Sequence, residues 1–376
     1  MKILIIASTV PYEMMGGAEY KAILLAHGFS QHGHQVAYLA TAAASNQESM
    51  DGDVHIYRIS SWREIGSEKH GAAMSAILDS IAPDVVLVTD FYEYFWAIPA
   101  CHSRKIPVVT VANGTMESSP FLTGESIREF MAYLIYGDML LHLRAFTSLR
   151  YTNLHICISK KILARTNRWF SNLPTRVIYY GQPFPPPEQL HEGSSGQAIW
   201  VNNIKHWKRP EAFIDLARSI PEFRFIQIGR LPVGRYLRKF QAKLSAAPDN
   251  FTFLGPLPVE EVNRHLGQSD LFILTSSKSE GFSLSVIQSW LRRVPVVSLE
   301  FDPEGLIEGQ RLGRVCQRDP QRLVKEVREL MRDENTRIEI GQRARDFALN
   351  QFSLERMVLE YESALESVLP GNGSTP

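Results

Sequence analysis

A short stretch of the chain combines a carboxylate, a glycine and small polar residues directly after an apolar run. Glu280 and Gly281 follow the apolar run 271–274, and a helical pattern starts after them. In an open α/β sheet, ligands bind where a strand's carboxyl end meets a helix start, because the free amides and the helix dipole favour an anion. A carboxylate would repel a phosphate alone. Glu280 therefore indicates a ligand that carries hydroxyl groups beside its phosphate, as a nucleotide sugar does.

A second candidate segment is basic. Lys205, Lys208 and Arg209 follow the apolar run 198–201, and Pro210 suits the first turn of a helix. These three cations could bind a phosphate group. The simple alternative is a basic loop that only faces solvent. Preorganised cations and helix N-termini stabilise negative charge that grows on a phosphate group. A lysine together with helix N-termini can supply such donors without a metal ion.

Two adjacent glycines, Gly16 and Gly17, stand between the first predicted strand and the first predicted helix. Glycine lets the backbone approach a ligand closely, and the helix N-terminus adds an anion site. The pattern is not Gly-x-Gly-x-x-Gly, so it does not support NAD binding. The alternative is a tight turn that needs glycine.

Composition indicates a globular protein that is not built to bind nucleic acid. The 376 residues suffice for two domains, and 44% of them are hydrophobic. The 40 basic and 40 acidic residues cancel, whereas nucleic-acid binders carry a basic excess. Cys101, Cys157 and Cys316 form neither a disulfide nor a metal pattern. No apolar run reaches the roughly 18 residues of a membrane span. We therefore expect a cytoplasmic protein.

The elements that must position these residues follow a strand–helix alternation. In the first half, strands are predicted at 3–7, 36–40, 55–59, 85–89 and 108–111. A Pro-rich segment at 181–187 and a polar stretch at 191–197 mark a linker. The alternation restarts with strands predicted at 198–201, 225–228, 251–254, 271–274 and 294–298, and helices follow the first, second and fourth of them. From Pro320 the pattern is helical. Such alternation predicts mostly parallel sheets covered by helices.

Several of these segments resemble the donor-site motifs of retaining glycosyltransferases with the two-domain GT-B fold, in the large family four, the glycosyl transferases group 1. The residues from Glu280 to Phe282 and from Pro295 to Val297 match its Glu-Gly-Phe and Pro-Val-Val elements. The family has a second glutamate eight positions after the first, and here that position holds Gln288.

The other two segments are also similar to this family. Residues 16–19 read Gly-Gly-Ala-Glu and match its Gly-Gly-x-Glu loop. In the basic segment, Lys208 falls on the lysine of the Gly-Arg-x-x-x-x-Lys pattern, while Asn203 falls on the arginine, and Lys205 or Arg209 could supply the missing charge. Asn113 stands where the family commonly has histidine. Asparagine can hydrogen-bond a sugar hydroxyl group but cannot titrate, so a general base is not expected there.

The resemblance implies an α/β architecture of two Rossmann-like domains facing a central cleft. Residues 1–185 would form an N-terminal, acceptor-side domain, and residues 186–352 a nucleotide-sugar-binding domain. Residues 353–370 would form a C-terminal helix that returns to the first domain. Catalytic roles would fall to Glu280, Lys208 and Asn113. Donor binding would involve Gly16, Gly17, Asn203, Lys208, Gly281, Phe282, Ser283, Leu284 and Gln288.

The implied activity moves a hexosyl group from a UDP or GDP sugar to an acceptor hydroxyl group with retention of configuration, in polysaccharide or glycoconjugate synthesis. The acceptor would be a sugar, a glycolipid or a small molecule. No cofactor or metal is expected, because the Asp-x-Asp triplet at 51–53 precedes a predicted strand instead of ending one. The alternatives are a nucleotide-sugar epimerase or hydrolase on the same fold, or a non-catalytic sugar-nucleotide-binding protein.

One apolar segment leaves a membrane contact open. Residues 126–136 have capping-box spacing followed by an apolar helix, and a second apolar run covers 139–144. Core packing is one interpretation. The other is an interfacial helix near a membrane that holds a lipid-linked acceptor, which would place the protein at the inner face of the membrane.

Overall fold

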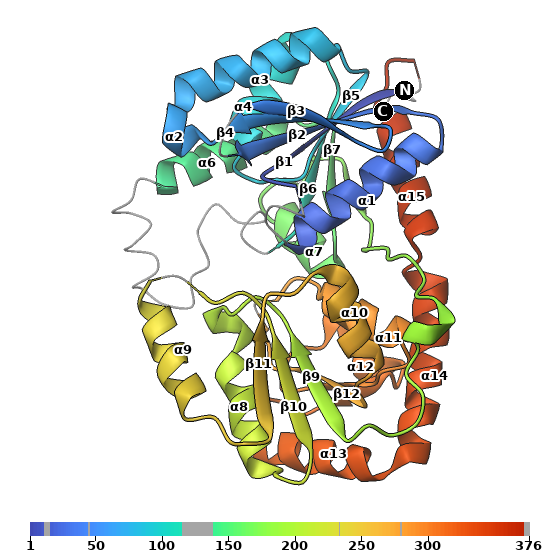
Figure 1. Cartoon of the computed structure of the whole chain (residues 1–376). Coiled ribbons are helices and arrows are strands. Elements are labelled where there is room, and N and C mark those ends of the chain that lie inside the picture. The colour runs from blue at the N-terminus through green and yellow to red at the C-terminus, as the bar shows by residue number, and fades with distance from the viewer. Residues whose placement is uncertain (11–15, 44–45, 115–137, 233, 279, 372–376) are drawn as a thin grey trace. The chain divides into compact units, whose positions relative to one another are not determined.

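The computed structural model of the chain describes residues 1–10, 16–43, 46–114, 138–232, 234–278 and 280–371 (Figure 1). The predicted helix at 126–136 lies outside these residues. Two compact units divide the chain: unit 1 comprises Met1–Gly181 with Leu354–Pro376, and unit 2 comprises Gln182–Ser353. Among the described residues, no helix has both the length and the apolar content needed to cross a bilayer.

Unit 1 is built on an eight-stranded sheet of order β3-β4-β2-β1-β5-β6-β7-β8. Only β3 runs antiparallel to its neighbour. The strands are β1 (Lys2–Ala7), β2 (Gln35–Ala43), β3 (Gln47–Asp51), β4 (Val54–Ser60), β5 (Val85–Val88), β6 (Val108–Ala112), β7 (Leu154–Cys157) and β8 (Thr175–Val177). The five predicted strands are confirmed. The sequence did not reveal β3, β7 and β8, because polar residues dominate the edge strands β3 and β8, and His155 interrupts the apolar residues of β7.

Helices cover both faces of this sheet. They are α1 (Gly17–Gln31), α2 (Trp62–Ile65), α3 (Ser67–Ile81), α4 (Tyr94–Ser103), α6 (Asp138–Ser148), α7 (Lys160–Asn167) and α15 (Leu354–Glu366), with a 3₁₀ turn η2 (Leu149–Tyr151). One core cluster joins the sheet to α3, α4 and α6. The last helix, α15, packs on α1 (Figure 1). A Cβ atom at Gly28 of α1 would lie 2.4 Å from Val358 Cγ2, so only glycine permits this close approach.

Unit 2 is built on a fully parallel six-stranded sheet of order β11-β10-β9-β12-β13-β14. Its strands are β9 (Gln197–Val201), β10 (Arg224–Ile228), β11 (Phe251–Gly255), β12 (Leu271–Leu274), β13 (Val296–Ser298) and β14 (Gly313–Val315). Five of these were predicted, and the three-residue edge strand β14 was not. Long apolar runs account for the success, because strands buried on both faces are apolar at consecutive positions.

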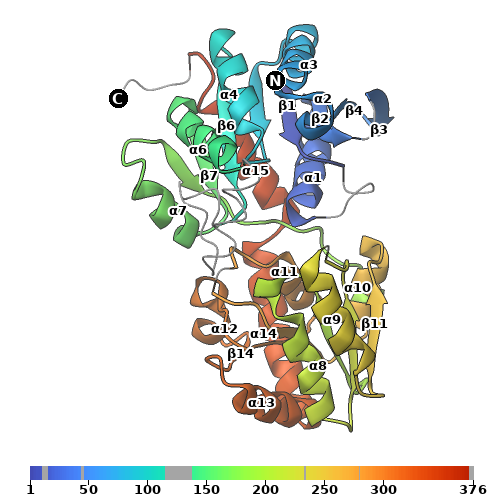
Figure 2. The same cartoon turned by 90° about the vertical axis from the view of Figure 1, so that its left-hand side faces the viewer.

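The helices of unit 2 fall into two groups. They are α8 (Pro210–Ser219), α9 (Arg235–Ser245), α10 (Val259–Gly267), α11 (Leu284–Leu291), α12 (Leu306–Gly309), α13 (Pro320–Arg332) and α14 (Glu334–Gln351), with 3₁₀ turns η3 (Pro187–Gln189), η4 (His206–Lys208) and η5 (Pro303–Gly305). Helices α8, α9 and α13 bury their apolar sides in one core cluster. Helix α8 lies beside α9 (Figure 2) and also contacts α13, while α11 contacts α10 and α14. Helix α10, which follows the third strand, was not predicted.

Each sheet has a point where the strand order reverses. In unit 1, β1 lies between β2 and β5, and in unit 2, β9 lies between β10 and β12. Crossover connections leave such neighbouring strands in opposite directions, which opens a crevice at their carboxyl ends. Ligand-binding loops are therefore expected after β1 and β5 in unit 1, and after β9 and β12 in unit 2.

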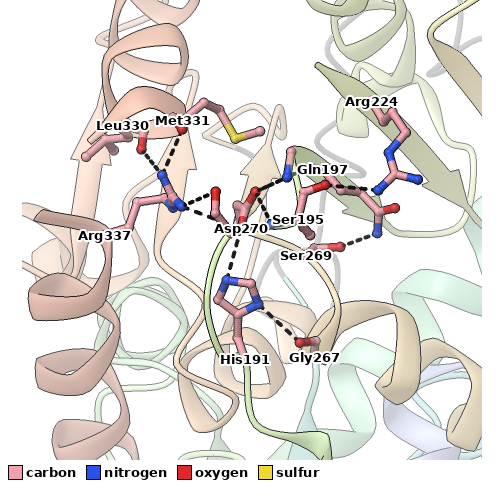
Figure 3. A network of polar contacts seen from close by, with 12 residues as sticks. His191, Ser195, Gln197, Arg224, Gly267, Ser269, Asp270, Leu330, Met331 and Arg337 are labelled. Carbon is pink, nitrogen blue, oxygen red and sulfur yellow. Dashed lines mark hydrogen bonds and ion pairs between the residues drawn. The ribbon is translucent and has the colours of Figure 1, made fainter. Parts of the chain in front are cut away.

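At the amino-terminal ends of the unit 2 strands, the buried Asp270 holds the start of β9 in place (Figure 3). Its carboxylate accepts hydrogen bonds from the backbone amides of Ser195, Gly196 and Gln197, the shortest at 2.6 Å. His191 Nε2 lies 3.0 Å and Arg337 Nη2 lies 3.7 Å from Asp270 Oδ1. Because Arg337, His191 and several backbone donors converge on one carboxylate, this network fixes the segment that leads into β9.

Candidate active site

In unit 2, the loops that follow β9 and β12 are bonded to each other at the reversal point. Thr275 Oγ1 accepts a hydrogen bond from Trp200 Nε1 at 2.8 Å and donates one to the carbonyl oxygen of Lys208 at 2.6 Å. The amide of Ser277 donates to the carbonyl oxygen of Trp207 at 2.8 Å. These bonds hold the two loops in a fixed arrangement at the carboxyl ends of the two strands.

The central contact of this site is an ion pair between Lys208 Nζ and Glu280 Oε2. The lysine comes from the loop after β9 and the glutamate from the loop after β12. Their side chains are only 13% and 10% exposed. Partial burial makes the attraction between the two charges stronger than in a surface ion pair. Both groups lie in loops at the carboxyl ends of the strands. The structure thus joins two predicted catalytic residues that are distant in sequence.

The residues after Glu280 divide into an anchor and a set of backbone donors. Phe282 is buried with its ring 5.6 Å from that of Phe352, so its side chain belongs to the core. Ser283 is the N-cap residue of α11, and Leu284 begins the helix. First-turn amides of a helix have no intrahelical acceptor, so the start of α11 can offer backbone N–H groups to an anion. Binding of a donor anion by these amides stays a prediction.

The basic loop after β9 has fewer available charges than its sequence suggests. Arg209 forms an ion pair with Glu300, and Lys205 Nζ lies 5.0 Å above the ring of Trp207. Asn203 is exposed, and its Oδ1 accepts a hydrogen bond from the amide of Arg230 at 3.4 Å. Arg209 is therefore paired with Glu300 and does not supply the positive charge that is missing at position 203. A neutral hydrogen bond from Asn203 to the donor stays a prediction.

Gln288 lies deeper than its predicted contact with a ribose suggests. Its side chain is on α11, one turn after Leu284, and the residue is 7% exposed. Its Nε2 lies 3.4 Å from Gln182 Oε1, at the start of unit 2. The ribose contact stays a prediction, and the structure adds Gln182 as the neighbour that shares this polar position.

Gly229 is a site residue that sequence reasoning missed. A Cβ atom at this position would lie 1.8 Å from the carbonyl oxygen of Asn202. The loop after β10 therefore touches the loop after β9 backbone to backbone, which every side chain other than hydrogen would prevent. The available signal was a glycine directly after the predicted strand at 225–228.

In unit 1, Gly16 and Gly17 lie at the start of α1, as predicted from their position after the first strand. Gly16 is the N-cap residue, and its carbonyl oxygen accepts the hydrogen bond from Tyr20 N at 3.0 Å. A Cβ atom at Gly16 would lie 2.1 Å from Glu19 Oε2, whose carboxylate also accepts a hydrogen bond from Ser8 Oγ at 2.8 Å. The lack of a side chain thus makes room for Glu19. A contact between these glycines and the donor stays a prediction.

Asn113 lies directly after β6, where its side chain is held by three partners. Oδ1 accepts from Lys21 Nζ at 2.6 Å and lies 3.4 Å from the hydroxyl group of Tyr180. Nδ2 donates to the carbonyl oxygen of Thr89, at the end of β5, at 2.7 Å. The oxygen of this amide is therefore occupied, so towards a ligand Asn113 offers an N–H donor.

Asp90 is a carboxylate that the sequence could not single out from its neighbours. It follows β5 at the reversal point, and its Oδ1 accepts from the amide of Tyr92 at 2.9 Å. Burial, with Glu93 and Glu19 nearby, raises the pKa of Asp90 to about 7. Two further titratable residues lie near Asn113 in the sequence. His102 contacts the ring of Tyr151, and Glu117 lies outside the described residues.

The Asp-x-Asp triplet lies away from these loops. Asp51 ends β3 and Val54 begins β4, so the triplet forms the turn of an antiparallel hairpin. His27 Nε2 lies 3.2 Å from Asp51 Oδ2. Within the part of the chain that the structure describes, no group of three His, Cys, Asp or Glu side chains could hold a metal ion. Metal independence stays a prediction.

Comparison with protein families gives two consecutive matches. The family described as "Glycosyltransferase Family 4" matches residues 15–181, and the family described as "Glycosyl transferases group 1" matches residues 185–347. The first match lies within unit 1 and the second within unit 2. Between them they account for most of the chain.

Individual proteins agree with this result. An uncharacterised glycosyltransferase of Methanocaldococcus jannaschii is 23% identical over 209 residues, which are 51% of this chain and 53% of that protein. The chain thus spans about half the length of this curated relative.

Solved structures extend the similarity over both units. Sucrose-phosphate synthase of Thermosynechococcus elongatus has a TM-score of 0.78 at 13% identity, covering 97% of this chain and 98% of that one. HepE of Anabaena, solved with UDP and glucose, has a TM-score of 0.74 at 17% identity, covering 98% and 100%. The similarity shows that both units share the GT-B fold. Together with the two family matches, it shows that this chain belongs to the group 1 glycosyltransferases.

Proposed function

We propose that this protein transfers a hexosyl group from a nucleotide-diphosphate sugar to an acceptor hydroxyl group, with retention of anomeric configuration. The observation that carries the proposal is the Lys208–Glu280 ion pair at the reversal point of unit 2, beside the start of α11. A diphosphate suits Lys208 and the helix amides, and sugar hydroxyl groups suit Glu280. A ligand that offers both kinds of group satisfies both members of the pair.

The chemistry follows from this division of roles. When the anomeric C–O bond breaks, negative charge grows on the leaving diphosphate and the sugar ring gains positive charge. Lys208, Asn203 and the amides from Gly281 to Leu284 would stabilise the first, and Glu280 the second. The similarity to HepE, which was solved with UDP and glucose, makes a uridine nucleotide the first donor to test, and a GDP sugar the second.

Replacing Lys208 with alanine is expected to weaken turnover or binding of the donor by roughly ten-fold or more, about 1.4 kcal/mol, because the ammonium group is the nearest fixed cation to Glu280. The measurement is calorimetric binding of UDP and GDP, followed by steady-state kinetics with the sugar of the nucleotide that binds. Lys325→Ala, an exposed lysine on α13, is the matched control. Unchanged binding and kinetics in Lys208→Ala would contradict the assignment.

Catalysis without a divalent metal is proposed from the same site, because Lys208 and the start of α11 can neutralise a diphosphate. Activity is expected to survive an excess of EDTA, measured as UDP release from UDP-glucose. A complete loss on chelation that Mg²⁺ or Mn²⁺ restores would show that the protein residues alone do not suffice.

Three other functions fit the same fold, and analysis of products and turnover tells them apart. A nucleotide-sugar epimerase would convert the donor without releasing the nucleotide, and a hydrolase would transfer the sugar only to water. A non-catalytic binding protein would bind the nucleotide sugar without turnover. The neutral residues Asn113, Asn203 and Gln288 motivate this last alternative, but all three keep hydrogen-bonding ability, so we favour an active transferase.

The acceptor is proposed to be a sugar, glycolipid or small molecule, and the charge distribution of unit 1 favours one held at an anionic membrane. Residues 139–187 contain no Asp or Glu but seven basic residues: Arg144, Arg150, Lys160, Lys161, Arg165, Arg168 and Arg176. Large hydrophobic side chains in the same segment are also exposed, among them Leu140 by 57%, Tyr151 by 55% and Trp169 by 50%. A segment that combines basic residues with exposed hydrophobic and aromatic side chains is typical of peripheral contact with anionic lipid.

The lipid contact predicts that the protein co-sediments with vesicles that contain phosphatidylglycerol, and that high salt releases it. The variant Lys160→Ser/Lys161→Ser/Arg168→Ser should lose at least about half of the bound fraction, since each basic residue near an anionic surface contributes roughly 1 kcal/mol. Replacing three basic residues of unit 2, Lys239, Lys243 and Lys325, is the matched control. Equal sedimentation with neutral phosphatidylcholine vesicles would contradict the proposal.

A further inference from the structure

A lysine is buried directly behind Asn113. Lys21 lies in the second turn of α1 and is 1% exposed. Its ammonium group donates to Asn113 Oδ1 at 2.6 Å. It also lies 5.2 Å from the ring centre of Tyr180 and 5.9 Å from that of Tyr361. The cation therefore has an amide oxygen in front of it and two aromatic faces around it.

These partners fix the orientation of the Asn113 side chain. A lysine ammonium group can only donate, so the amide oxygen must face it, and the carbonyl oxygen of Thr89 can only accept, so the amide nitrogen must face that. Only one of the two Nδ2 hydrogens is used by Thr89. The second has no acceptor among the described residues, and Asn113 is partly exposed. The amide cannot turn over without placing its NH₂ group against the lysine.

The positive charge does more than fill space. Burying an ammonium group is costly, and a methionine of similar length would pack there without that cost. The charge also draws electron density from the amide oxygen, which makes the remaining N–H group a stronger donor. A stronger and immobile donor is useful only where an oxygen atom has to be bound in a defined place.

We propose that Lys21 is a positioning residue, which locks Asn113 so that its free N–H group donates to a hydroxyl oxygen of the sugar being transferred. The proposal rests on the transfer reaction proposed above. Lys21 itself does not touch the sugar and acts through Asn113. The position therefore works as a permanent donor and takes no part in proton transfer.

The first arm of the test compares Lys21→Met with the exposed control Lys69→Met on α3, using UDP release from UDP-glucose, or GDP release from GDP-mannose if the protein binds GDP. Lys21→Met should lower kcat by roughly ten-fold while KM and the Kd of the free nucleotide change by less than about two-fold, because the lost orientation matters most in the transition state. Lys21→Arg, which keeps a cation, should recover part of kcat. A wild-type kcat in Lys21→Met would overturn the proposal.

The second arm tests whether Lys21 acts through Asn113. Asn113→Ala should lower kcat at least as much as Lys21→Met does, and the double variant should be no slower than Asn113→Ala alone. Asn113→Asp keeps a partner for Lys21, and hence the fold, but removes the N–H donor, so it should be as slow as Asn113→Ala. Losses that multiply in the double variant, or an active Asn113→Asp, would overturn the proposal even if Lys21→Met fails to fold. If the wild-type protein binds no nucleotide and turns over no nucleotide sugar, the proposed function fails, and this inference fails with it.

Discussion

Replacing Glu280 with glutamine is expected to lower kcat by about 100-fold while the affinity for the nucleotide falls far less. The substitution keeps the shape of the side chain and removes its charge. Glu280 is 8% exposed, its backbone amide donates to the carbonyl oxygen of Ser277 at 3.1 Å, and its carboxylate is held by the ion pair with Lys208. A fixed negative charge beside the sugar ring stabilises the positive transition state more than the neutral ground state, and only such differences accelerate the reaction.

Steady-state kinetics with the donor, together with calorimetric binding of the free nucleotide, would separate these two effects. Glu339→Gln on α14 is the matched control, since Glu339 forms only an exposed pair with Arg343. Gln288→Glu should be tolerated or alter nucleotide affinity, because the amide of Gln182 is close enough to donate to a carboxylate there. A wild-type kcat in Glu280→Gln would show that this carboxylate serves the structure of the loop alone.

Replacing Asp270 with asparagine is expected to lower the free energy of unfolding more than the other substitutions named above. The carboxylate is fully buried and accepts backbone hydrogen bonds from three consecutive residues, 195–197. Asparagine would turn an NH₂ group towards some of these donors, would leave Arg337 without its buried counter-charge and would weaken the contact with His191. Breaking a buried ion pair in this way costs about 3–5 kcal/mol. Thermal unfolding, with Asp346→Asn on the exposed side of α14 as the control, measures the difference.

The same network sets a pH dependence. Burial by itself would raise the pKa of Asp270, but the His191 contact, the Ser195 amide and Arg337 outweigh it, so the pKa lies below the usual 3.8. A lowered carboxyl pKa gives a stabilisation that is fully present above the unfolded-state pKa and is lost as the pH falls through the folded-state pKa. The stability gap between wild type and Asp270→Asn should therefore be constant near neutral pH and shrink below about pH 3.8. A gap that persists unchanged at low pH would assign the effect to packing.

Much of the architecture could be predicted because it depends on local patterns. Five strands of unit 1 and five of the six strands of unit 2 could be predicted because they are rich in apolar and β-branched residues and have turn residues at their ends. The exceptions are β3, β7, β8 and β14, in which polar, charged or glycine residues stand among few apolar ones. A short edge strand gains its hydrogen bonds from its neighbour, so its own residues carry little sign of it.

The candidate site divides along the same line. The sequence by itself determined where the ligand-binding loops lie, because Glu280, Lys208 and the glycines at 16 and 17 follow predicted strands at family-typical spacing. Only the tertiary structure decided which side chains meet. The order of the strands brings Lys208 to Glu280 and Arg209 to Glu300, which form ion pairs. It also buries Lys21 behind Asn113. Each contact joins segments that are far apart in the chain, and a buried polar side chain is stable only beside a partner that the fold supplies.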